Sequence, residues 1–493
     1  MCDAPSVEQA TAAFVSLALF AIEHARSHDE EDLMKNKPTL RDPQTMTRSP
    51  GVTYQELLDQ DTHPVPDVLR LESPMDFGNE DISTERYTSR EWFDREVEFL
   101  WRRVWQYTCR EEELPEPGDY YKYDIAGRSF LVIRTQSGEI KAYPNACLHR
   151  GRMLKEYDGR ASELRCPFHG FCWSLDGKLT DVPARWDFDH IEDENWSLPE
   201  LPVATWGGFI FINPDQECEP FEEFIEDIKA QFSESWPLED LHIASHTAKT
   251  VGANWKIAQE AFCEAYHVNA THPQILMSLG DTNSQVDVWR NCARVITPGG
   301  TPSPLLDEEP TTDQMVAYSM DLREGEPIPK VPDGMSVRAF RAAGMREALR
   351  GAVGSRVDEC SDAELVDSID YTLFPNFHPW GAYNQIVYRF RPNGNDHRSA
   401  IMECIMLAPF EGERPPPAEI RWLAEDESWS KAVGFLGKVF DQDFFNMPKV
   451  QQGLESTYKP GVTLASYQES KVRWLHHRLG EFIEEGEKKA GAK

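Results

Sequence analysis

Short segments in which apolar and polar residues alternate dominate the chain between residues 120 and 213. They are found at 121–125, 129–134 and 207–213, and glycine, proline, asparagine or aspartate residues bound them. Alternation with a period of two is typical of strands, and turn-forming residues at their ends favour tight connections. This pattern predicts a small domain of antiparallel β-strands.

Beyond Pro214 the periodicity is mixed. Apolar residues with helical spacing occur at 221–232 and 256–269, and strand-like runs occur at 285–296, 371–377, 385–390 and 400–407. The last long helical region follows three prolines at 415–417 and runs to about residue 457. This order predicts an α+β domain in which helices cover an antiparallel sheet.

The length of 493 residues allows more than one core. We expect an N-terminal extension, partly helical at 7–34 and of uncertain order, over residues 1–85. A lead helix and the β domain follow over 86–215, and the α+β domain occupies 216–493. Within it, residues 297–363 are rich in proline, glycine and charge, which predicts an insertion or a lid.

The formal charge of −34, from 50 basic and 84 acidic residues, argues against nucleic acid or an anionic membrane as the main partner. It suits a protein partner with a basic patch, although a highly soluble surface explains the same charge. The apolar stretch at 12–22 is too short to span a bilayer and lacks the basic flank of a signal peptide. We therefore expect a cytoplasmic protein without a membrane span.

Two pairs of metal-binding residues lie in the predicted β domain. Cys147 and His149 form the first pair, and Cys166 and His169 form the second. Two thiolates on one iron and two imidazoles on the other are the ligands of a high-potential [2Fe-2S] cluster. A structural zinc site uses the same residue types, but the spacing differs from that of common zinc fingers.

The segments CLHRG and CPFHG, with Trp173 and Gly177 after them, resemble the Rieske motif of aromatic-ring-hydroxylating oxygenases. The resemblance is to the alpha subunits of this family, which are Rieske non-haem iron oxygenases. It implies a Rieske [2Fe-2S] domain followed by a catalytic domain of helix-grip, START-like fold. Phe171 departs from the family, which often has Trp there, but all four ligands are present.

A second candidate site lies in the run 254–273. On a continuous helix, Glu260, Glu264 and His267 would share one face. Pro273 disfavours helical geometry at His272, which can then turn back toward His267. Two imidazoles could meet one metal ion there, although a histidine in a protein core is more often structural.

A non-haem iron site also needs a carboxylate, and residues 439–453 offer Asp443 and Asp441. The segment resembles the part of the family that carries the ligand aspartate, and the match selects Asp443, with Asp441 as the alternative. The resemblance, over about residues 89–454, then implies that His267, His272 and Asp443 bind a mononuclear Fe(II).

Glu264 takes the place of the acidic residue that, in the family, links the two metal centres between neighbouring subunits of a trimer. The family usually has Asp at this position and commonly Asn at the position of Ala261. A longer carboxylate can still bridge, and a glutamate on a helix surface is the simpler alternative.

No nucleotide-binding glycine motif, P-loop or plant-type ferredoxin motif is evident in the sequence. Electrons from NAD(P)H would therefore reach the chain only through a partner reductase, with or without a ferredoxin. By resemblance we expect a homotrimer, with a beta subunit as an open possibility.

The expected function is hydroxylation of a hydrophobic, aromatic or polycyclic substrate with O₂, as in aromatic hydrocarbon catabolism. Phe262, residues 371–377 and Phe440 are candidates for the substrate pocket, although phenylalanine is mostly a core residue. The alternatives are a Rieske demethylase or monooxygenase acting on a non-aromatic molecule, a Rieske electron-transfer protein, and a zinc-stabilised binding protein.

Overall fold

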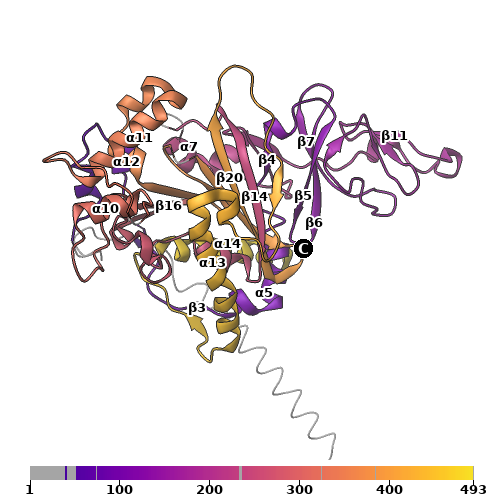
Figure 1. Cartoon of the computed structure of the whole chain (residues 1–493). Helices are drawn as coiled ribbons and strands as arrows, with labels where there is room; N and C mark the ends of the chain where they lie inside the picture. The colour runs from indigo at the N-terminus through magenta and orange to yellow at the C-terminus, as the bar shows by residue number, and fades with distance from the viewer. Residues whose placement is uncertain are drawn as a thin grey trace, which may run out of the picture.

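The computed structural model describes residues 39–40, 51–73, 75–232, 236–323, 325–383 and 385–491. It is an α+β protein, which confirms the predicted fold class, with two β regions and a set of covering helices (Figure 1). The helix expected at 7–34 lies outside the described residues. No helix among the described residues is long and apolar enough to cross a membrane.

The larger sheet has eight strands in the order β15-β16-β17-β18-β19-β20-β14-β21. The strands are β14 (Leu241–Val251), β15 (Gln285–Val288), β16 (Cys292–Thr297), β17 (Ser368–Leu373), β18 (Phe377–Pro379), β19 (Ile386–Asn393), β20 (Asp396–Pro409) and β21 (Ile420–Trp422). All neighbours are antiparallel except β14 and β21, which are parallel. The single strand expected at 285–296 is a hairpin, because Trp289 N donates to Cys292 O at 2.8 Å and turns the chain.

The smaller β region contains three short sheets, ordered β7-β6-β5-β8, β12-β13-β4 and β11-β10-β9. Its strands are β4 (Gln106–Arg110), β5 (Asp119–Ile125), β6 (Arg128–Arg134), β7 (Ile140–Pro144), β8 (Gly159–Arg160), β9 (Leu164–Arg165), β10 (Cys172–Trp173), β11 (Leu179–Asp181), β12 (Val203–Trp206) and β13 (Phe209–Ile212). The strands predicted at 121–125, 129–134 and 207–213 are confirmed as β5, β6 and β13. In Figure 1, β11 lies at the far end of this region from the large sheet.

Helices cover the large sheet as predicted. The main ones are α4 (Glu85–Thr88), α5 (Arg90–Phe99), α6 (Phe221–Phe224), α7 (Glu226–Phe232), α8 (Trp255–Glu260), α9 (Val268–Thr271), α13 (Ser430–Ser456) and α14 (Ser470–Gly491). Helix α14 packs on β15, β16 and α5, while α8 packs on β19 and β20, and α13 packs on β14 and α8.

The long helix expected to end near residue 457 is confirmed as α13, which ends at Ser456, but the expectation that it is the last long helix was wrong, because α14 follows it. Its buried residues Val472, Leu475, Leu479 and Ile483 recur every three or four positions, which is the helical period. The many charged residues between them lower the mean hydropathy and hide this pattern. The prolines at 415–417 lead first to the edge strand β21 and then to α13.

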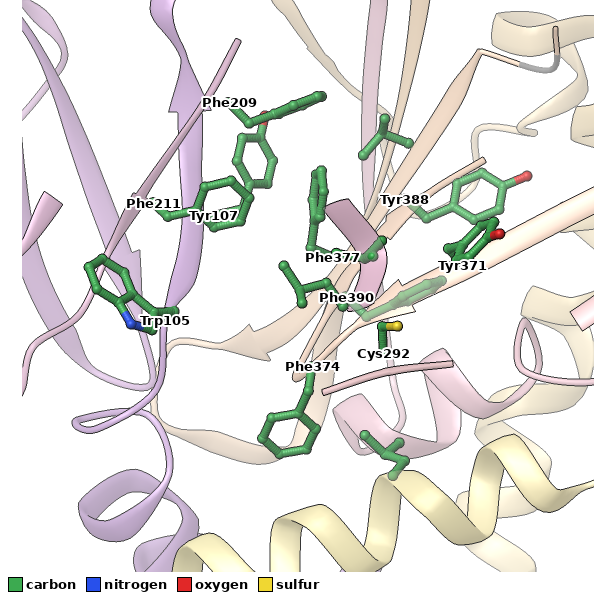
Figure 2. Close-up of a cluster of buried hydrophobic side chains, with 14 of the residues drawn as sticks. Trp105, Tyr107, Phe209, Phe211, Cys292, Tyr371, Phe374, Phe377, Tyr388 and Phe390 are labelled. Carbon is green, nitrogen blue, oxygen red and sulfur yellow. The ribbon is translucent and has the colours of Figure 1, made fainter. Parts of the chain in front are cut away.

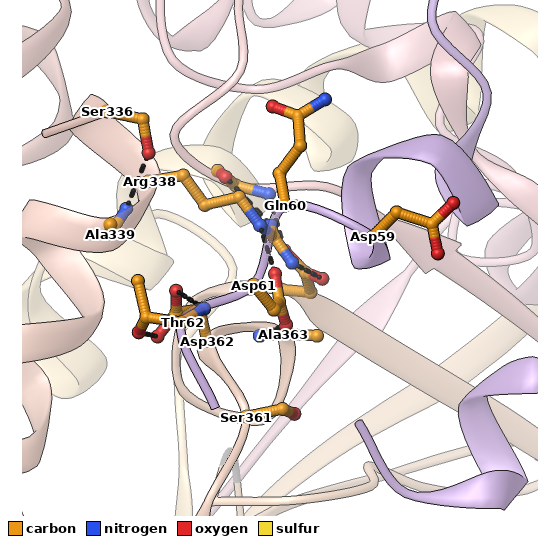
Figure 3. Close-up of polar contacts among 12 residues, drawn as sticks. Asp59, Gln60, Asp61, Thr62, Ser336, Arg338, Ala339, Ser361, Asp362 and Ala363 are labelled. Carbon is orange, nitrogen blue, oxygen red and sulfur yellow. Dashed lines mark hydrogen bonds and ion pairs between the residues drawn. The ribbon is translucent and has the colours of Figure 1, made fainter. Parts of the chain in front are cut away.

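The segment 297–363 connects β16 to its sheet neighbour β17. It forms α10 (Thr312–Ser319) and α11 (Val337–Val353), and α12 (Asp362–Val366) follows directly. The turn after α2 (Tyr54–Leu58) joins this segment, because Asp61 binds Arg338 at 3.0 Å and Thr62 binds Asp362 at 2.8 Å (Figure 3). Polar contacts from early in the chain therefore fix the position of α11.

An aromatic cluster joins the two β regions (Figure 2). The Phe377 ring lies 4.8 to 5.4 Å, between centroids, from the rings of Tyr107, Phe209 and Phe211. Aromatic rings packed edge to face at such distances attract one another beyond the burial of their surface. The cluster holds the small β region against the large sheet.

A buried charge network reinforces this junction. Arg389 on β19 donates to the backbone oxygens of Tyr107 and Thr108 and to Glu403 on β20 at 2.5 Å. Arg391 binds the second oxygen of Glu403 at 2.7 Å. Burial alone would raise the pKa of Glu403, but the two arginines hold it well below its usual range.

We predict that Glu403→Gln destabilises the protein by about 3 kcal/mol, because the buried Arg389 guanidinium loses its counter-charge. Urea denaturation followed by circular dichroism measures this. Glu98→Gln, which breaks a half-exposed pair with Arg102, is the control and should cost less than about 1 kcal/mol. Equal effects of the two substitutions would contradict the prediction.

Candidate metal centres

A break between α8 and α9 shapes the first candidate site. The expected continuous helix over 256–269, with Glu260, Glu264 and His267 on one face, was wrong, because α8 ends at Glu260. Glu264 Oε2 accepts the His267 N–H at 2.9 Å, and in a continuous helix this N–H would donate to the Cys263 carbonyl. Glu260 instead binds His476 at 2.7 Å, away from His267.

The break allows three candidate ligands to converge. The Nε2 atoms of His267 and His272 lie 3.2 Å apart, and Asp443 Oδ1 from α13 lies 3.6 Å from the first and 2.9 Å from the second. His272 has φ −124° and ψ 53°, which confirms the non-helical geometry that Pro273 predicted. Among the described residues, this is the group whose three donor atoms lie within 4.8 Å of one another.

The remaining nitrogen of each imidazole is held by a side chain. His267 Nδ1 lies 2.8 Å from Glu264 Oε1, and His272 Nδ1 lies 2.8 Å from Gln442 Oε1. Each Nδ1–H donates to these oxygens, so each Nε2 keeps its lone pair for a metal ion. Gln274 Nε2 also donates to Gln442 Oε1 at 2.7 Å and orients it.

Sequence reasoning missed Gln442. The one sequence feature that could have pointed to it is that Gln442 directly precedes Asp443 on the same predicted helix.

The electrostatics of this group favour a cation. Burial lowers the pKa of His267, but the hydrogen bond and charge of Glu264, together with the charge of Asp443, raise it above its ordinary value overall. Asp443 and His272 are almost fully buried. Positive charge is thus stabilised where the three donor atoms meet, which suits a divalent metal ion.

Asp441, the alternative carboxylate, lies elsewhere. Its oxygens accept the N–H groups of Trp429 at 2.8 Å and Ser430 at 3.2 Å, together with the Ser428 hydroxyl. These bonds tie the start of α13 to a later turn of the same helix. The structure therefore brings Asp443, and not Asp441, to the two histidines.

The second candidate site is formed by two loops with the same hydrogen-bond pattern. Cys147 N donates to Arg152 O and Cys166 N to Phe171 O, both at 2.8 Å. Gly151 N donates back to Cys147 O at 2.8 Å, as Gly170 N does to Cys166 O at 3.0 Å. Gly151 and Gly170 have φ of 74° and 83°, a region that favours glycine, so each loop can close tightly.

The four predicted ligands of these loops face one another. The Cys147 and Cys166 thiols are in hydrogen-bond contact and form no disulfide, and the His149 and His169 rings lie 4.7 Å apart between centroids. His149 Nδ1 is buried without a hydrogen-bond partner among the described residues. A buried nitrogen lone pair beside two thiols fits a metal cluster that uses two sulfurs and two imidazoles.

Phe171 supports this loop pair. Its ring stacks on His149 with 4.6 Å between centroids and 16° between planes. Phe171, at a position where the family often has Trp, thus still places an aromatic ring against His149.

A cavity of about 530 Å³ adjoins the His267, His272 and Asp443 group. Phe262 and Phe440 line it, as predicted, and Tyr388 completes a triangle of edge-packed rings on its wall. The expected lining by residues 371–377 was wrong, because Tyr371, Phe374 and Phe377 are buried in the core. The other lining residues are mostly apolar and include Ile275, Leu279, Val295, Met345, Leu365, Val366, Trp380, Ile386, Met406, Leu436 and Val439.

Comparison with known families matches both parts of the chain. The model of the Rieske [2Fe-2S] domain matches residues 104–193, and that of the ring hydroxylating alpha subunit (catalytic domain) matches residues 232–485. The first match contains all four Cys and His residues of the paired loops. The second contains His267, His272 and Asp443.

Individual relatives agree with this assignment. The chain is 31% identical over 198 residues to the anthranilate 1,2-dioxygenase large subunit of Acinetobacter baylyi, covering 39% of this chain and 42% of the relative. It is 31% identical over 192 residues to the carnitine monooxygenase oxygenase subunit of Acinetobacter pittii, covering 38% and 51%. The matches thus span about half the length of these curated relatives.

A crystal structure of a quaternary ammonium Rieske monooxygenase with L-carnitine has the same fold. Its TM-score is 0.57 at 19% identity, and the match covers 82% of this chain and 95% of the other. The catalytic-domain match, the preceding Rieske domain and the shared fold establish that this chain belongs to the ring-hydroxylating alpha subunit family.

Proposed function

We propose that this chain is the catalytic component of a multicomponent Rieske oxygenase that hydroxylates a hydrophobic substrate with O₂ and externally supplied electrons. The observation that carries the proposal is the convergence of His267 Nε2, His272 Nε2 and Asp443 Oδ1 beside a largely apolar cavity of about 530 Å³. Two histidines and one carboxylate are the ligand set of non-haem iron oxygenases, which leave coordination positions open.

In the proposed sites, Cys147, Cys166, His149 and His169 hold a [2Fe-2S] cluster, and His267, His272 and Asp443 hold a mononuclear Fe(II). When bound, the cluster passes electrons on and the iron activates O₂.

The protein's own part is positioning. Glu264 and Gln442 fix the imidazole rings through their Nδ1 atoms, which keeps each Nε2 aimed at one point. Phe262, Tyr388 and Phe440 provide an apolar wall that excludes water and places the substrate beside that point.

Glu264 is also the proposed link to the cluster. Its side chain lines both the substrate cavity and a second cavity of about 690 Å³. Glu260 and Glu469 also line the second cavity. In a homotrimer, a Rieske histidine of a neighbouring subunit could enter from that second side and bond to the carboxylate.

The proposed partners are a reductase that oxidises NAD(P)H, with or without a ferredoxin. A homotrimer in the cytoplasm is the proposed assembly, with a beta subunit as the alternative.

Two substrate classes follow from the relatives, since one acts on anthranilate, which is aromatic, and another on carnitine, which is not. The aromatic or polycyclic class suits the size and the aromatic wall of the cavity. A pure electron-transfer protein needs neither the three-ligand group nor the cavity, so the structure favours an oxygenase over that alternative.

We predict that protein purified without oxygen contains about three irons and two acid-labile sulfides per chain and loses its red-brown colour on reduction. Metal analysis and visible spectra before and after dithionite measure this. About two irons that added Fe(II) cannot raise would indicate an electron carrier. Zinc without sulfide would indicate a zinc-stabilised binding protein.

We predict that His272→Ala lowers the iron content from about three to about two per chain and leaves the sulfide unchanged, because one of three mononuclear ligands is lost. The same metal analysis checks this result. Asp441→Asn is the matched control and should keep all of the iron. Full iron content in His272→Ala, or an equal loss of iron in Asp441→Asn, would contradict the proposed ligand set.

We predict that Glu264→Ala retains the [2Fe-2S] cluster but lowers turnover at least about tenfold, because His267 loses the bonds that orient it and the centres lose their link. Substrate-dependent O₂ uptake with reductase, together with iron content, measures this. Glu264→Asp should recover part of the activity. Full activity in Glu264→Ala would rule out the proposed role.

A further inference from the structure

One cationic side chain enters the substrate cavity from the segment between β16 and β17. Arg341 and Met345 lie four residues apart on α11 and both line the cavity, so one face of this helix forms part of the wall. Of these two residues, only Arg341 is polar. Neither the iron ligands nor the proposed electron link uses this residue.

The other three arginines of α11 that face protein partners have counter-charges. Arg338 binds Asp61 at 3.0 Å and Asp367 at 2.9 Å through Nη2, and Arg346 binds Asp362 at 3.3 Å. The carboxylates of Asp61, Asp367 and Asp362 are therefore already bound to these two arginines. Figure 3 shows the contact between Arg338 and Asp61.

Arg350, at the far end of the helix, pairs with Glu347 and Asp358, both at 2.7 Å. Within the described part of the chain, the Arg341 guanidinium has no ion pair or hydrogen bond to a carboxylate. Its charge is therefore the one on this helix left without a bound counter-charge.

Partial burial adds to the cost of the missing partner, because Arg341 is only partly exposed. The partial loss of water lowers the pKa of Arg341, and the charge of Asp367 opposes this shift. A guanidinium that has lost part of its water without binding an anion is less favourable, and an anionic ligand would offset that cost.

The other charged groups of the cavity do not supply this anion. Glu264 and Asp443 belong to the metal group, where they face His267. Asp370 lines the cavity but is bound to the buried Lys471 at 2.9 Å. The remaining wall is mostly apolar and aromatic, with the hydroxyl side chains of Ser278, Thr297, Ser319 and Ser368 as neutral polar groups, which fits the body of a ligand with a single anionic group.

The helix that carries Arg341 is anchored near this residue. Arg338, three residues earlier on α11, is held by Asp61 and Asp367, and Ala339 N donates to the Ser336 side chain at the start of the helix (Figure 3). The anchored helix limits how far the Arg341 backbone can move, and its guanidinium can bind a carboxylate through two parallel hydrogen bonds.

We propose that this cavity selects aromatic or polycyclic carboxylates, with Arg341 binding the carboxylate and the aromatic wall holding the ring system beside the metal group. The inference rests on the proposed function and specifies its substrate class. A ligand whose only charge is positive is disfavoured, because it would meet the unpaired guanidinium.

The test is isothermal titration calorimetry on the metal-loaded protein without O₂ or reductant. The probes are benzoate, naphthoate and anthracene carboxylate, each compared with its neutral carboxamide of the same shape. We expect at least one carboxylate to bind at least about tenfold more tightly than its amide.

Arg341→Gln should lower that carboxylate affinity at least about tenfold and leave the amide affinity within about twofold. Arg350→Gln, a change to a paired and exposed arginine on the same helix, is the matched control and should preserve the carboxylate preference. Circular dichroism and metal content confirm that each variant is folded and loaded.

The proposal is overturned if no carboxylate of the series binds below about 1 mM, if the amides bind equally well, or if Arg341→Gln keeps the preference. These outcomes are separate from those of the proposed function, because binding is measured without turnover. A carboxylate preference in a protein that lacks a mononuclear iron would leave the ligand class standing and remove the oxygenase assignment.

Discussion

The bond between Glu264 and His267 is the contact on which the candidate oxygen-activating site depends. Both carboxylate oxygens bind His267, one at the backbone N–H and one at the ring. The first contact ends the helix after Glu260 and the second sets the imidazole orientation. Without the break, His267 and His272 would sit on different faces of one helix, and Asp443 could not reach both.

Rigid surroundings hold this site in place. Asp443 is carried by α13, which packs against β14 and α8, so the carboxylate and the histidines share one support. The pair of Arg389 and Glu403, with the aromatic cluster around Phe377, fixes the small β region to the same sheet. The two candidate metal centres thus belong to parts of the chain that are joined by dense packing.

The sequence allowed the fold class and the residues of both candidate centres to be predicted. Spacing indicated the paired Cys and His residues, Pro273 indicated the turn at His272, and the family resemblance selected Asp443. It did not reveal the helix break, since that depends on a side-chain carboxylate competing with a backbone carbonyl for the same N–H. The roles of Gln442 and Arg341 depend on which distant segment each one meets after folding. Residues 371–377 were misplaced because aromatic residues of a core and of a pocket have the same pattern.

The most direct test of two iron centres in one chain is anomalous X-ray scattering from crystals, recorded on both sides of the iron absorption edge. The account predicts two adjacent iron peaks among Cys147, His149, Cys166 and His169, and a third peak between His267, His272 and Asp443. Absence of the third peak from iron-loaded protein, or a signal at the zinc edge in either place, would contradict it.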